Sequence, residues 1–214
     1  MKIIIFGATG MVGQGALREA LLAEDVEQVL AVVRKPTGVR HPKLEEVALA
    51  DFADLTPIED DLRGYDACFY CLGVSSVGLD EAAYTRISYD YPVAAAHQLA
   101  RLNPAMTFIY VSGAGTKPDS RRMWARVKGR TEIEVIKTFK NGYGFRPGFI
   151  QPTHGATSGT RGYRIGYALT APLIPLLDRL FPKYVTSTDR LGQAMLRAAR
   201  TGFPTHIVEN AGLR

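Results

Sequence analysis

The stretch IIIFGATGMVGQGAL, at residues 3–17, constrains the fold of this chain more than any other. An apolar run typical of a strand is followed by Gly7, Gly10 and Gly13 and then by a helical pattern, and this context turns a glycine pattern into a dinucleotide-binding hypothesis. We expect Gly7 to permit a tight turn, Gly10 to let backbone N–H groups approach a pyrophosphate, and Gly13 to pack the helix closely on the strand. Thr9 adds a hydroxyl to the loop. The alternative is a glycine-rich turn that binds no ligand.

Short apolar runs alternate with longer helical patterns over the first two thirds of the chain. The predicted strands cover residues 2–6, 27–33, 44–50, 65–71, 106–112 and 143–147, and the predicted helices cover 12–23, 58–63, 81–102 and 121–139. This alternation predicts parallel β/α units with right-handed crossovers, and therefore an α/β fold with a doubly wound parallel sheet, the Rossmann fold. Several strands are almost entirely apolar, as strands covered by helices on both faces should be.

The sequence changes in character after Pro147. Residues 151–162 are rich in Gly, Thr and Ser and predict a loop, and an aromatic, proline-rich apolar segment follows at 163–184. Because Pro172 and Pro175 argue against one unbroken helix, we expect a substrate lid or packing element there, with a membrane-surface helix as the alternative. A helix at 188–200 and a strand at 205–209 follow. We expect a single NAD(P)-binding domain over residues 1–214, with 151–214 as a small substrate-side extension over the cofactor edge of the sheet.

Composition limits the class of protein. With 214 residues, of which 46% are hydrophobic and 22% charged, the chain can form a core that needs no metal or disulfide. The basic residues behind the formal charge of +5 are scattered among acidic ones except at Arg34, Lys35 and residues 121–130, so we expect a small anionic ligand and no nucleic acid. We also expect no membrane span. The N-terminus lacks a signal-peptide pattern, which predicts a cytoplasmic protein. We expect this protein to be a monomer or a homodimer.

The cysteines and histidines predict no metal site. Cys68 and Cys71 form a CxxC in an apolar run. Residues three apart on a strand point to opposite faces, so we expect two small buried side chains and no disulfide or shared metal. His41, His97 and His206 have no cysteine or carboxylate partners at metal-ligand spacing.

The end of the second predicted strand bears on the choice of cofactor. At this point, about 20 residues beyond the glycine loop, an acidic residue would hold the ribose 2′-hydroxyl of NAD. The sequence instead reads AVVRKPTG, with Arg34 and Lys35. A guanidinium and an ammonium suit a 2′-phosphate, so we expect NADP(H) in preference to NAD(H). The alternative is a solvated basic turn.

Six motifs occur in the order found in one large superfamily. They are GATGMVG at 7–13, ADF at 50–52, CLG at 71–73, VSGAG at 111–115, the helix that carries Lys128, and FRPGFI at 145–150. With them the chain resembles an atypical member of the short-chain dehydrogenase/reductase superfamily, similar to NAD(P)-dependent epimerase/dehydratase-like and NmrA-like NAD(P)-binding proteins. The resemblance runs from residue 1 to about residue 155.

The resemblance implies roles for particular residues. Asp51 would lie beside the adenine, Lys128 would hold the nicotinamide ribose, and Ser112 takes the position of the catalytic serine. Pro147 and Gly148 would face the nicotinamide carboxamide. Together with the glycine loop and the basic pair, the expected cofactor-binding residues are Gly7, Thr9, Gly10, Met11, Val12, Gly13, Arg34, Lys35, Asp51, Phe52, Cys71, Leu72, Gly73, Lys128, Pro147, Gly148, Phe149 and Ile150.

The pattern fails at Trp124. The superfamily has a tyrosine at this position, four residues before the lysine. Its phenol transfers a proton at the substrate oxygen while hydride moves, helped by the lysine, which lowers the pKa of the phenol. An indole N–H donates a hydrogen bond but exchanges no proton at physiological pH, so Trp124 cannot replace that acid. Trp124 would form either a wall of the site or part of the core.

Another group must then supply the proton if the chain is an enzyme. His154 is the best substitute, because an imidazole titrates near neutral pH; a surface-loop histidine is the alternative. Tyr163 and Tyr167 are further side chains that could reach the pocket. We expect Ser112 and Lys128 to serve an NADP(H)-dependent oxidoreductase or epimerase-like enzyme with an unidentified small substrate. The alternative is a non-catalytic NADP(H)-binding regulator or redox sensor that acts through a protein partner.

Overall fold

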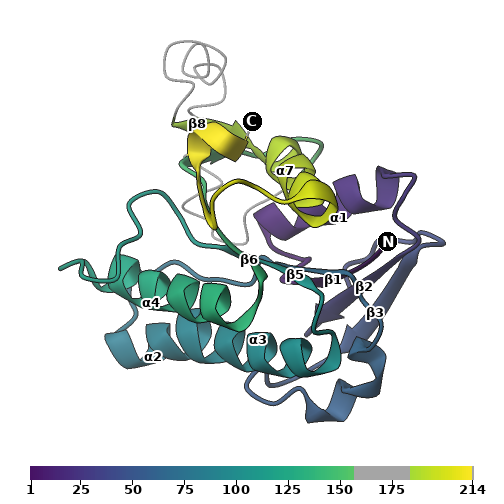
Figure 1. Ribbon diagram of the computed structural model, residues 1–214, viewed down its shortest axis with the longest axis horizontal. Helices are drawn as coiled ribbons and strands as arrows, with labels where there is room; N and C mark the ends of the chain where they lie inside the picture. Colours follow the sequence, from purple (N-terminus) through teal and green to yellow (C-terminus); the bar gives the residue numbers. More distant parts are fainter. Residues whose placement is uncertain (157–183, 214) are drawn as a thin grey trace.

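The computed structural model describes residues 1–156 and 184–213 of the chain. Its centre is a seven-stranded sheet with the order β3-β2-β1-β4-β5-β6-β9, and all neighbouring strands are parallel (Figure 1). The strands are β1 (Lys2–Phe6), β2 (Gln28–Val33), β3 (Leu44–Ala48), β4 (Ala67–Tyr70), β5 (Thr107–Val111), β6 (Asn141–Arg146) and β9 (Ile207–Glu209). The sequence-based prediction of a doubly wound Rossmann sheet is confirmed. The strand order reverses between β1 and β4, where such sheets bind ligands.

Helices cover both faces of this sheet. One face carries α1 (Met11–Leu22) and α7 (Thr188–Thr201), and the other carries α2 (Glu81–Thr85), α3 (Tyr91–Leu102) and α4 (Met123–Thr138) (Figure 1). The result is a three-layer arrangement in which the sheet is buried on both sides.

The apolar run of β1 supplies a core on each side of the sheet. Ile3 and Ile5 belong to the hydrophobic cluster under α1 and α7, whereas Ile4 and Phe6 belong to the cluster under α3 and α4. Successive side chains of a strand point to opposite faces, so a strand covered on both sides must be apolar throughout.

The helical region predicted at 81–102 contains a local change of helix type. Between α2 and α3 lies a π-helical turn, η3 (Arg86–Asp90), and Pro92 follows at the start of α3. Because proline has no N–H, it cannot bond to a carbonyl in the preceding turn. The Ser88 carbonyl oxygen accepts instead from the Tyr110 hydroxyl at 3.1 Å and from the Thr131 hydroxyl at 2.6 Å. The break in the helix therefore links α3 to β5 and α4.

Some elements differ from the sequence-based expectation. The short helix expected at 58–63 is a pair of 3₁₀ turns, η1 (Thr56–Ile58) and η2 (Asp60–Leu62). A small parallel sheet of β7 (Phe149–Gln151) and β8 (Val185–Ser187) was not predicted. The three-residue strands β7 and β8 carry too little pattern to be recognised, whereas the three-residue β9 lies within the strand predicted at 205–209.

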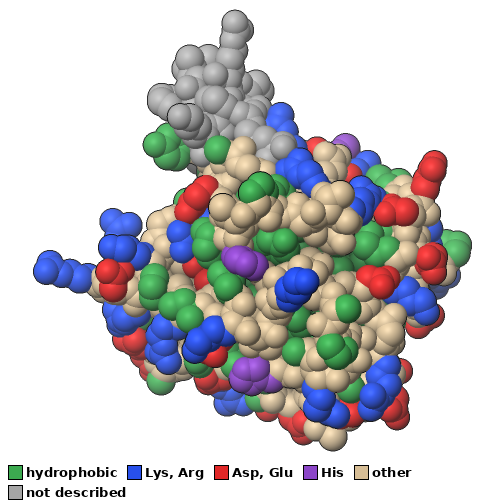
Figure 2. Space-filling view, in the orientation of Figure 1, with side chains coloured by type: hydrophobic (Ala, Val, Ile, Leu, Met, Phe, Trp, Pro, Cys, Tyr) green, Lys and Arg blue, Asp and Glu red, His purple; other side chains and the backbone are tan. Residues whose placement is uncertain are grey.

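The C-terminal part of the chain contributes to the main sheet. α7 packs along α1, β9 pairs with β6, and η5 (Asn210–Leu213) follows β9. Nearly all of the apolar segment expected to be a lid, at 163–184, lies outside the described residues. Within the described residues, no helix has the length and apolar character needed to cross a membrane. On the face shown in Figure 2, basic and acidic side chains are interspersed over the molecule.

Candidate functional site

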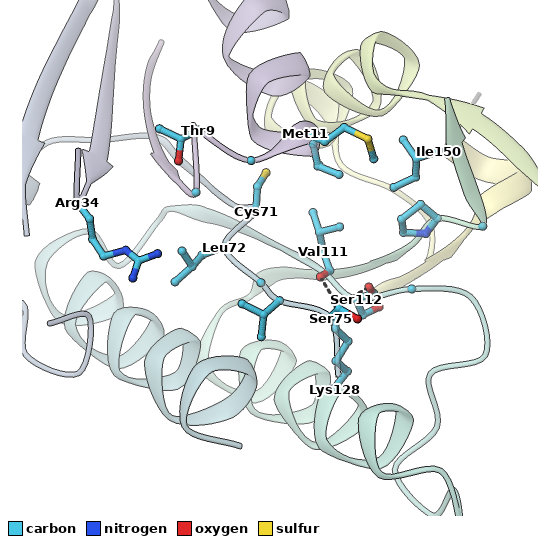
Figure 3. Close-up of a pocket in the computed structure, with 18 residues that line it drawn as sticks. Thr9, Met11, Arg34, Cys71, Leu72, Ser75, Val111, Ser112, Lys128 and Ile150 are labelled. Atoms are coloured by element: carbon cyan, nitrogen blue, oxygen red, sulfur yellow. Dashed lines mark hydrogen bonds between the residues drawn. The ribbon is translucent and has the colours of Figure 1, made fainter. Parts of the chain in front are cut away.

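A cavity of about 590 Å³, called the main cavity below, lies at the strand reversal. Figure 3 shows Arg34 at one end of it, Ser112 and Lys128 towards the other, and Cys71 and Leu72 between them. Most of the residues expected to bind the cofactor lie on its wall. The lining residues are Gly7, Thr9, Gly10, Met11, Val12, Arg34, Cys71, Leu72, Gly73, Val74, Ser75, Val111, Ser112, Gly113, Lys128, Pro147, Gly148 and Ile150.

The glycine loop has the geometry that its sequence predicted. Gly7 has a φ of +79°, and an added Cβ there would lie 2.6 Å from the backbone nitrogen of Leu72. A Cβ on Gly13 would lie 2.0 Å from the Gly7 carbonyl oxygen, so Gly13 acts through packing and does not line the main cavity. Gly10 is the N-cap of α1 and provides no side-chain cap. The first N–H groups of α1 are therefore available to an anion.

A smaller cavity of about 420 Å³ adjoins the main cavity at the end of β2. The two share Gly7, Thr9, Arg34 and Leu72, whereas Lys35 and Phe52 line only the smaller one. Arg34 and Lys35 are exposed and form no ion pair with any side chain in the described ranges. Their charges are therefore available to a ligand in these cavities.

Asp51 stands apart from both cavities. Its carboxylate accepts from the Ala53 backbone N–H at 3.0 Å and pairs with Arg86 at 3.4 Å. Both side chains are exposed, so the pair contributes at most about 1 kcal/mol. The adjacent Phe52 is buried and packs edge-on against the Phe6 ring, with 6.1 Å between the ring centroids. Phe52, rather than Asp51, forms part of the cavity wall.

Ser112 is joined to a buried ion pair beneath the cavity. Its hydroxyl donates to the Glu132 carboxylate at 2.5 Å, and its oxygen lies 3.0 Å from the Phe145 carbonyl oxygen. The Glu132 side chain is 2% exposed and accepts two hydrogen bonds from the Arg146 guanidinium, at 3.0 and 2.7 Å. Arg146 also reaches Glu209 at 2.9 Å. A hydroxyl has one proton, so while that proton is held by Glu132, Ser112 presents only lone pairs to the cavity.

Lys128 reaches the same region from α4. Its Nζ donates to the carbonyl oxygen of Ser112 at 2.7 Å and lies 3.4 Å from that of Val111 (Figure 3). Burial of the ammonium lowers the pKa of Lys128 to about 8, against the opposing attraction of the Glu132 carboxylate. Such a group changes charge close to physiological pH.

The Pro147–Gly148 turn is held by hydrogen bonds from two directions. The Ala114 N–H donates to the Pro147 carbonyl at 2.8 Å, and the Gly148 N–H donates to the Asn210 side-chain oxygen at 2.8 Å. Asn210 also donates to the Val185 carbonyl at 3.2 Å. A residue near the C-terminus therefore positions one wall of the main cavity.

Neither Trp124 nor His154 lines the main cavity. Trp124 is half-buried and does not line the main cavity; a Cβ added to Gly115 would lie 3.8 Å from its ring. His154 is exposed, with a φ of 51°, and lines a second cavity of about 610 Å³ along another part of α1. That cavity shares only Thr9 with the main one among their described lining residues. The structure therefore separates His154 from Ser112 and Lys128.

Of three further candidates, the structure describes only Phe149. Phe149 is 38% exposed in β7 and does not line the main cavity. Tyr163 and Tyr167 fall outside the described residues. Pro147, Gly148 and Ile150 therefore line the main cavity, whereas Phe149 does not.

Several residues of the site were not anticipated from the sequence. Glu132 carried a usable signal, because it lies four residues after Lys128 and so on the same face of the helix. Val74 and Ser75 follow directly after the CLG motif and line the cavity. Asn210 carried no such signal, since it is 62 residues from its partner Gly148.

Comparison with known proteins identifies the family. A family model described as NAD(P)H-binding matches residues 7–138. Protein FMP52-2, mitochondrial, from Scheffersomyces stipitis is 31% identical over 68% of this chain and 65% of its own length. Protein FMP52, mitochondrial, from Saccharomyces cerevisiae is 29% identical over 81% of this chain and 74% of its own length. The expectation of a cytoplasmic protein is wrong, because these relatives are named as mitochondrial proteins.

Solved structures share the fold at low sequence identity. The Bordetella bronchiseptica enzyme WbmF, in complex with NAD⁺, has a TM-score of 0.71 at 15% identity and covers 99% of this chain and 76% of its own. A short chain dehydrogenase family protein from Francisella tularensis has a TM-score of 0.70 at 14% identity, with 97% and 95% covered. The matched family model shows that this chain belongs to the NAD(P)H-binding family, and these structures show that it shares their fold.

Proposed function

We propose that this protein is an NADP(H)-dependent oxidoreductase or epimerase-like enzyme that acts on a small carbonyl or hydroxyl compound. The observation that carries the proposal is the main cavity, which joins the glycine loop, Arg34, Lys128 and the Pro147–Gly148 turn in one space of about 590 Å³. A cavity of this size and composition suits an extended anionic cofactor with a small substrate beside it.

The residues present fit a nicotinamide dinucleotide. Gly7 and Gly10 leave room at the N-terminus of α1 for a pyrophosphate. The turn requires glycine at position 7, because a side chain there would collide with Leu72. Lys128 would hold the nicotinamide ribose, and Pro147 and Gly148 would border the carboxamide. The cofactor, when bound, would supply or accept a hydride at this end of the cavity. The chain would position the two reactants and exclude water.

The basic pair supports NADP(H) in preference to NAD(H). Arg34 and Lys35 lie at the end of β2, line the smaller cavity and carry charges that no described acid neutralises. The described lining of that cavity contains no carboxylate that would select a free 2′-hydroxyl. A 2′-phosphate would complement both side chains.

Fluorescence titration with NADPH and NADH tests the cofactor assignment. We expect NADPH to bind at least about tenfold more tightly, a difference of about 1.4 kcal/mol. Arg34→Ala and Lys35→Ala should weaken NADPH binding and leave NADH binding unchanged, because NADH has no 2′-phosphate. Lys137→Ala is the matched control, since Lys137 is an exposed base at the far end of α4. Equal affinity for the two nucleotides, in wild type and variants alike, would contradict the assignment.

Consumption of NADPH with nitrobenzaldehyde, phenanthrenequinone and other simple carbonyl probes tests the enzymatic part. We expect turnover with wild type and a loss of turnover in Lys128→Ala at NADPH concentrations that saturate the variant. Tight NADPH binding without turnover of any probe would count against an enzyme.

A non-catalytic NADP(H)-binding regulator is the second candidate. Two observations favour it: Trp124 occupies the place of the proton-transferring tyrosine, and the Ser112 hydroxyl is engaged with Glu132. A regulator of this kind would bind the reduced and oxidised cofactors with different affinities. Comparing NADPH and NADP⁺ affinities, and the protein's oligomeric state in each complex, separates the two candidates.

A further inference from the structure

The main cavity contains few groups that could transfer a proton. The side chains on its described wall that carry a proton on nitrogen, oxygen or sulfur are Thr9, Arg34, Cys71, Ser75, Ser112 and Lys128. Hydroxyl groups and guanidinium do not titrate near neutral pH. Burial raises the pKa of the Cys71 thiol to about 12, which removes it as well. Lys128 is the one remaining acid on that wall.

The hydrogen bonds of Lys128 leave one proton unassigned. An ammonium has three N–H donors, and the carbonyl oxygens of Ser112 and Val111 receive two of them, at 2.7 and 3.4 Å. In the described parts of the chain no carboxylate lies within ion-pair distance of Nζ. The third N–H can therefore serve the cavity. If it is lost, the neutral amine keeps both backbone hydrogen bonds and points its lone pair where the proton was.

The charged and titratable groups next to Lys128 come from α4, β6 and β5, and Tyr84 of α2 adjoins Tyr110. Glu132 on α4 attracts the ammonium, but its carboxylate is already held by Arg146 from β6. The Tyr110 ring of β5 lies 6.0 Å from Nζ, and burial raises the pKa of its phenol; burial also raises the pKa of Tyr84 on α2. These phenols stay neutral near pH 7, so Lys128 is the group that changes charge.

We infer that Lys128 itself gives the proton to the substrate oxygen, the step that a tyrosine performs in related reductases and that Trp124 cannot perform. The inference rests on the proposed function. As hydride from the reduced nicotinamide forms the new C–H bond, the π electron pair of the C=O bond moves onto oxygen. That oxygen takes a proton from the Lys128 ammonium, so an O–H bond forms, an N–H bond breaks, and a neutral amine remains. Water returns the proton to the amine before the next turnover.

The protonation of Lys128 can be measured without any substrate. In protein labelled with ¹³C at the lysine ε-carbon, the Lys128 signal is assigned by its disappearance in Lys128→Arg, and its chemical shift is followed against pH. We expect a midpoint near 8, the pKa given above, well below the value of about 10.4 for a lysine in a model peptide. A midpoint above about 10 for Lys128 would overturn the inference, whatever the outcome of the cofactor titrations.

Turnover of the carbonyl probes provides the second test. The ammonium is the active form, so wild-type reduction should decline as pH rises through about 8. Lys128→Arg keeps the positive charge and donors but does not release its proton, so we expect near wild-type NADPH affinity with turnover lowered about 100-fold or more. Small primary amines should restore turnover in Lys128→Ala, and the restored rate should depend on the pKa of the amine, which a purely structural lysine would not produce.

The outcomes separate the two levels of proposal. Wild type that fails to bind either nucleotide, or binds NADPH without turning over any probe, overturns the proposed function and this inference together. Wild type that turns over the probes, with Lys128→Arg equally active or with no response of Lys128→Ala to amines, overturns the inference alone. Lys137→Arg should match wild type in every assay.

Discussion

The Ser112 hydroxyl donates a hydrogen bond of 2.5 Å to Glu132, whose carboxylate is also held by Arg146. A serine expected to face the substrate is therefore tied by its only proton to a buried ion pair. The Glu132 carboxylate therefore affects both the chemistry of the site, through Ser112, and the stability of the fold, through its ion pair with Arg146.

Replacement of Glu132 tests this connection. Glu132→Gln keeps the size of the side chain but removes the charge that balances Arg146, and leaving one partner of a buried ion pair uncompensated costs about 3 kcal/mol. We expect the free energy of unfolding, measured by urea denaturation, to fall by that amount. Glu134→Gln on the same helix is the control, because Glu134 forms a surface pair with Lys137 and its replacement should change stability by less than about 0.5 kcal/mol. If the two substitutions lowered the free energy of unfolding by similar amounts, the buried Glu132–Arg146 ion pair would contribute no more to stability than a surface pair.

Gly13→Ala should disrupt the glycine loop. The added Cβ would lie 2.0 Å from the Gly7 carbonyl oxygen, so α1 must move away from β1, at a cost of about 3 kcal/mol. Thermal unfolding should occur at a clearly lower temperature, and NADPH should bind more weakly to whatever folded protein remains. Gly73→Ala is the control for stability, since a Cβ there has no atom within 4 Å. An unchanged melting temperature for Gly13→Ala would refute the packing argument.

Asn210→Ala should loosen the wall of the main cavity from a distance. The substitution leaves the Gly148 N–H and the Val185 carbonyl without their present partner, and each buried group left unpaired costs about 1–3 kcal/mol. We expect lower stability and weaker NADPH binding, measured on the same samples by denaturation and by fluorescence. Asn141→Ala, at an exposed position of β6, should leave both unchanged. NADPH affinity equal to wild type in Asn210→Ala would mean that the turn holds its shape unaided.

Cys71 should react slowly although it lines the main cavity. Burial raises the pKa of its thiol from 9.0 to about 12, so the reactive thiolate at pH 8 is about a thousandfold scarcer than for a free thiol. Alkylation by iodoacetamide, followed by mass spectrometry, should be slow in native protein, should accelerate with rising pH, and should be fast after denaturation. Rapid native alkylation at Cys71 would contradict this expectation.

Local patterns were sufficient for the elements of the main sheet up to residue 146. The strand at residues 2–6 was predicted with the bounds that the structure has, because an all-apolar run followed by Gly7 has few other solutions. The same holds for the role of Gly13, since a close approach of helix and strand leaves no room for a side chain. Strands β7 and β8 escaped prediction, because three residues carry too little periodicity and the two strands pair across a long stretch of chain.

The sequence by itself determined the Rossmann fold, the glycine loop and most of the residues around the main cavity, because each of these follows from residues close together in the chain. Only the tertiary structure decided that Ser112 and Arg146 both bind the Glu132 carboxylate, and that the Asn210 side chain accepts a hydrogen bond from Gly148. It also decided that His154 lines a different cavity from Lys128. Such pairings join distant segments, and burial, which lowers the pKa of Lys128 to about 8, is a property of the packed fold that no local pattern records.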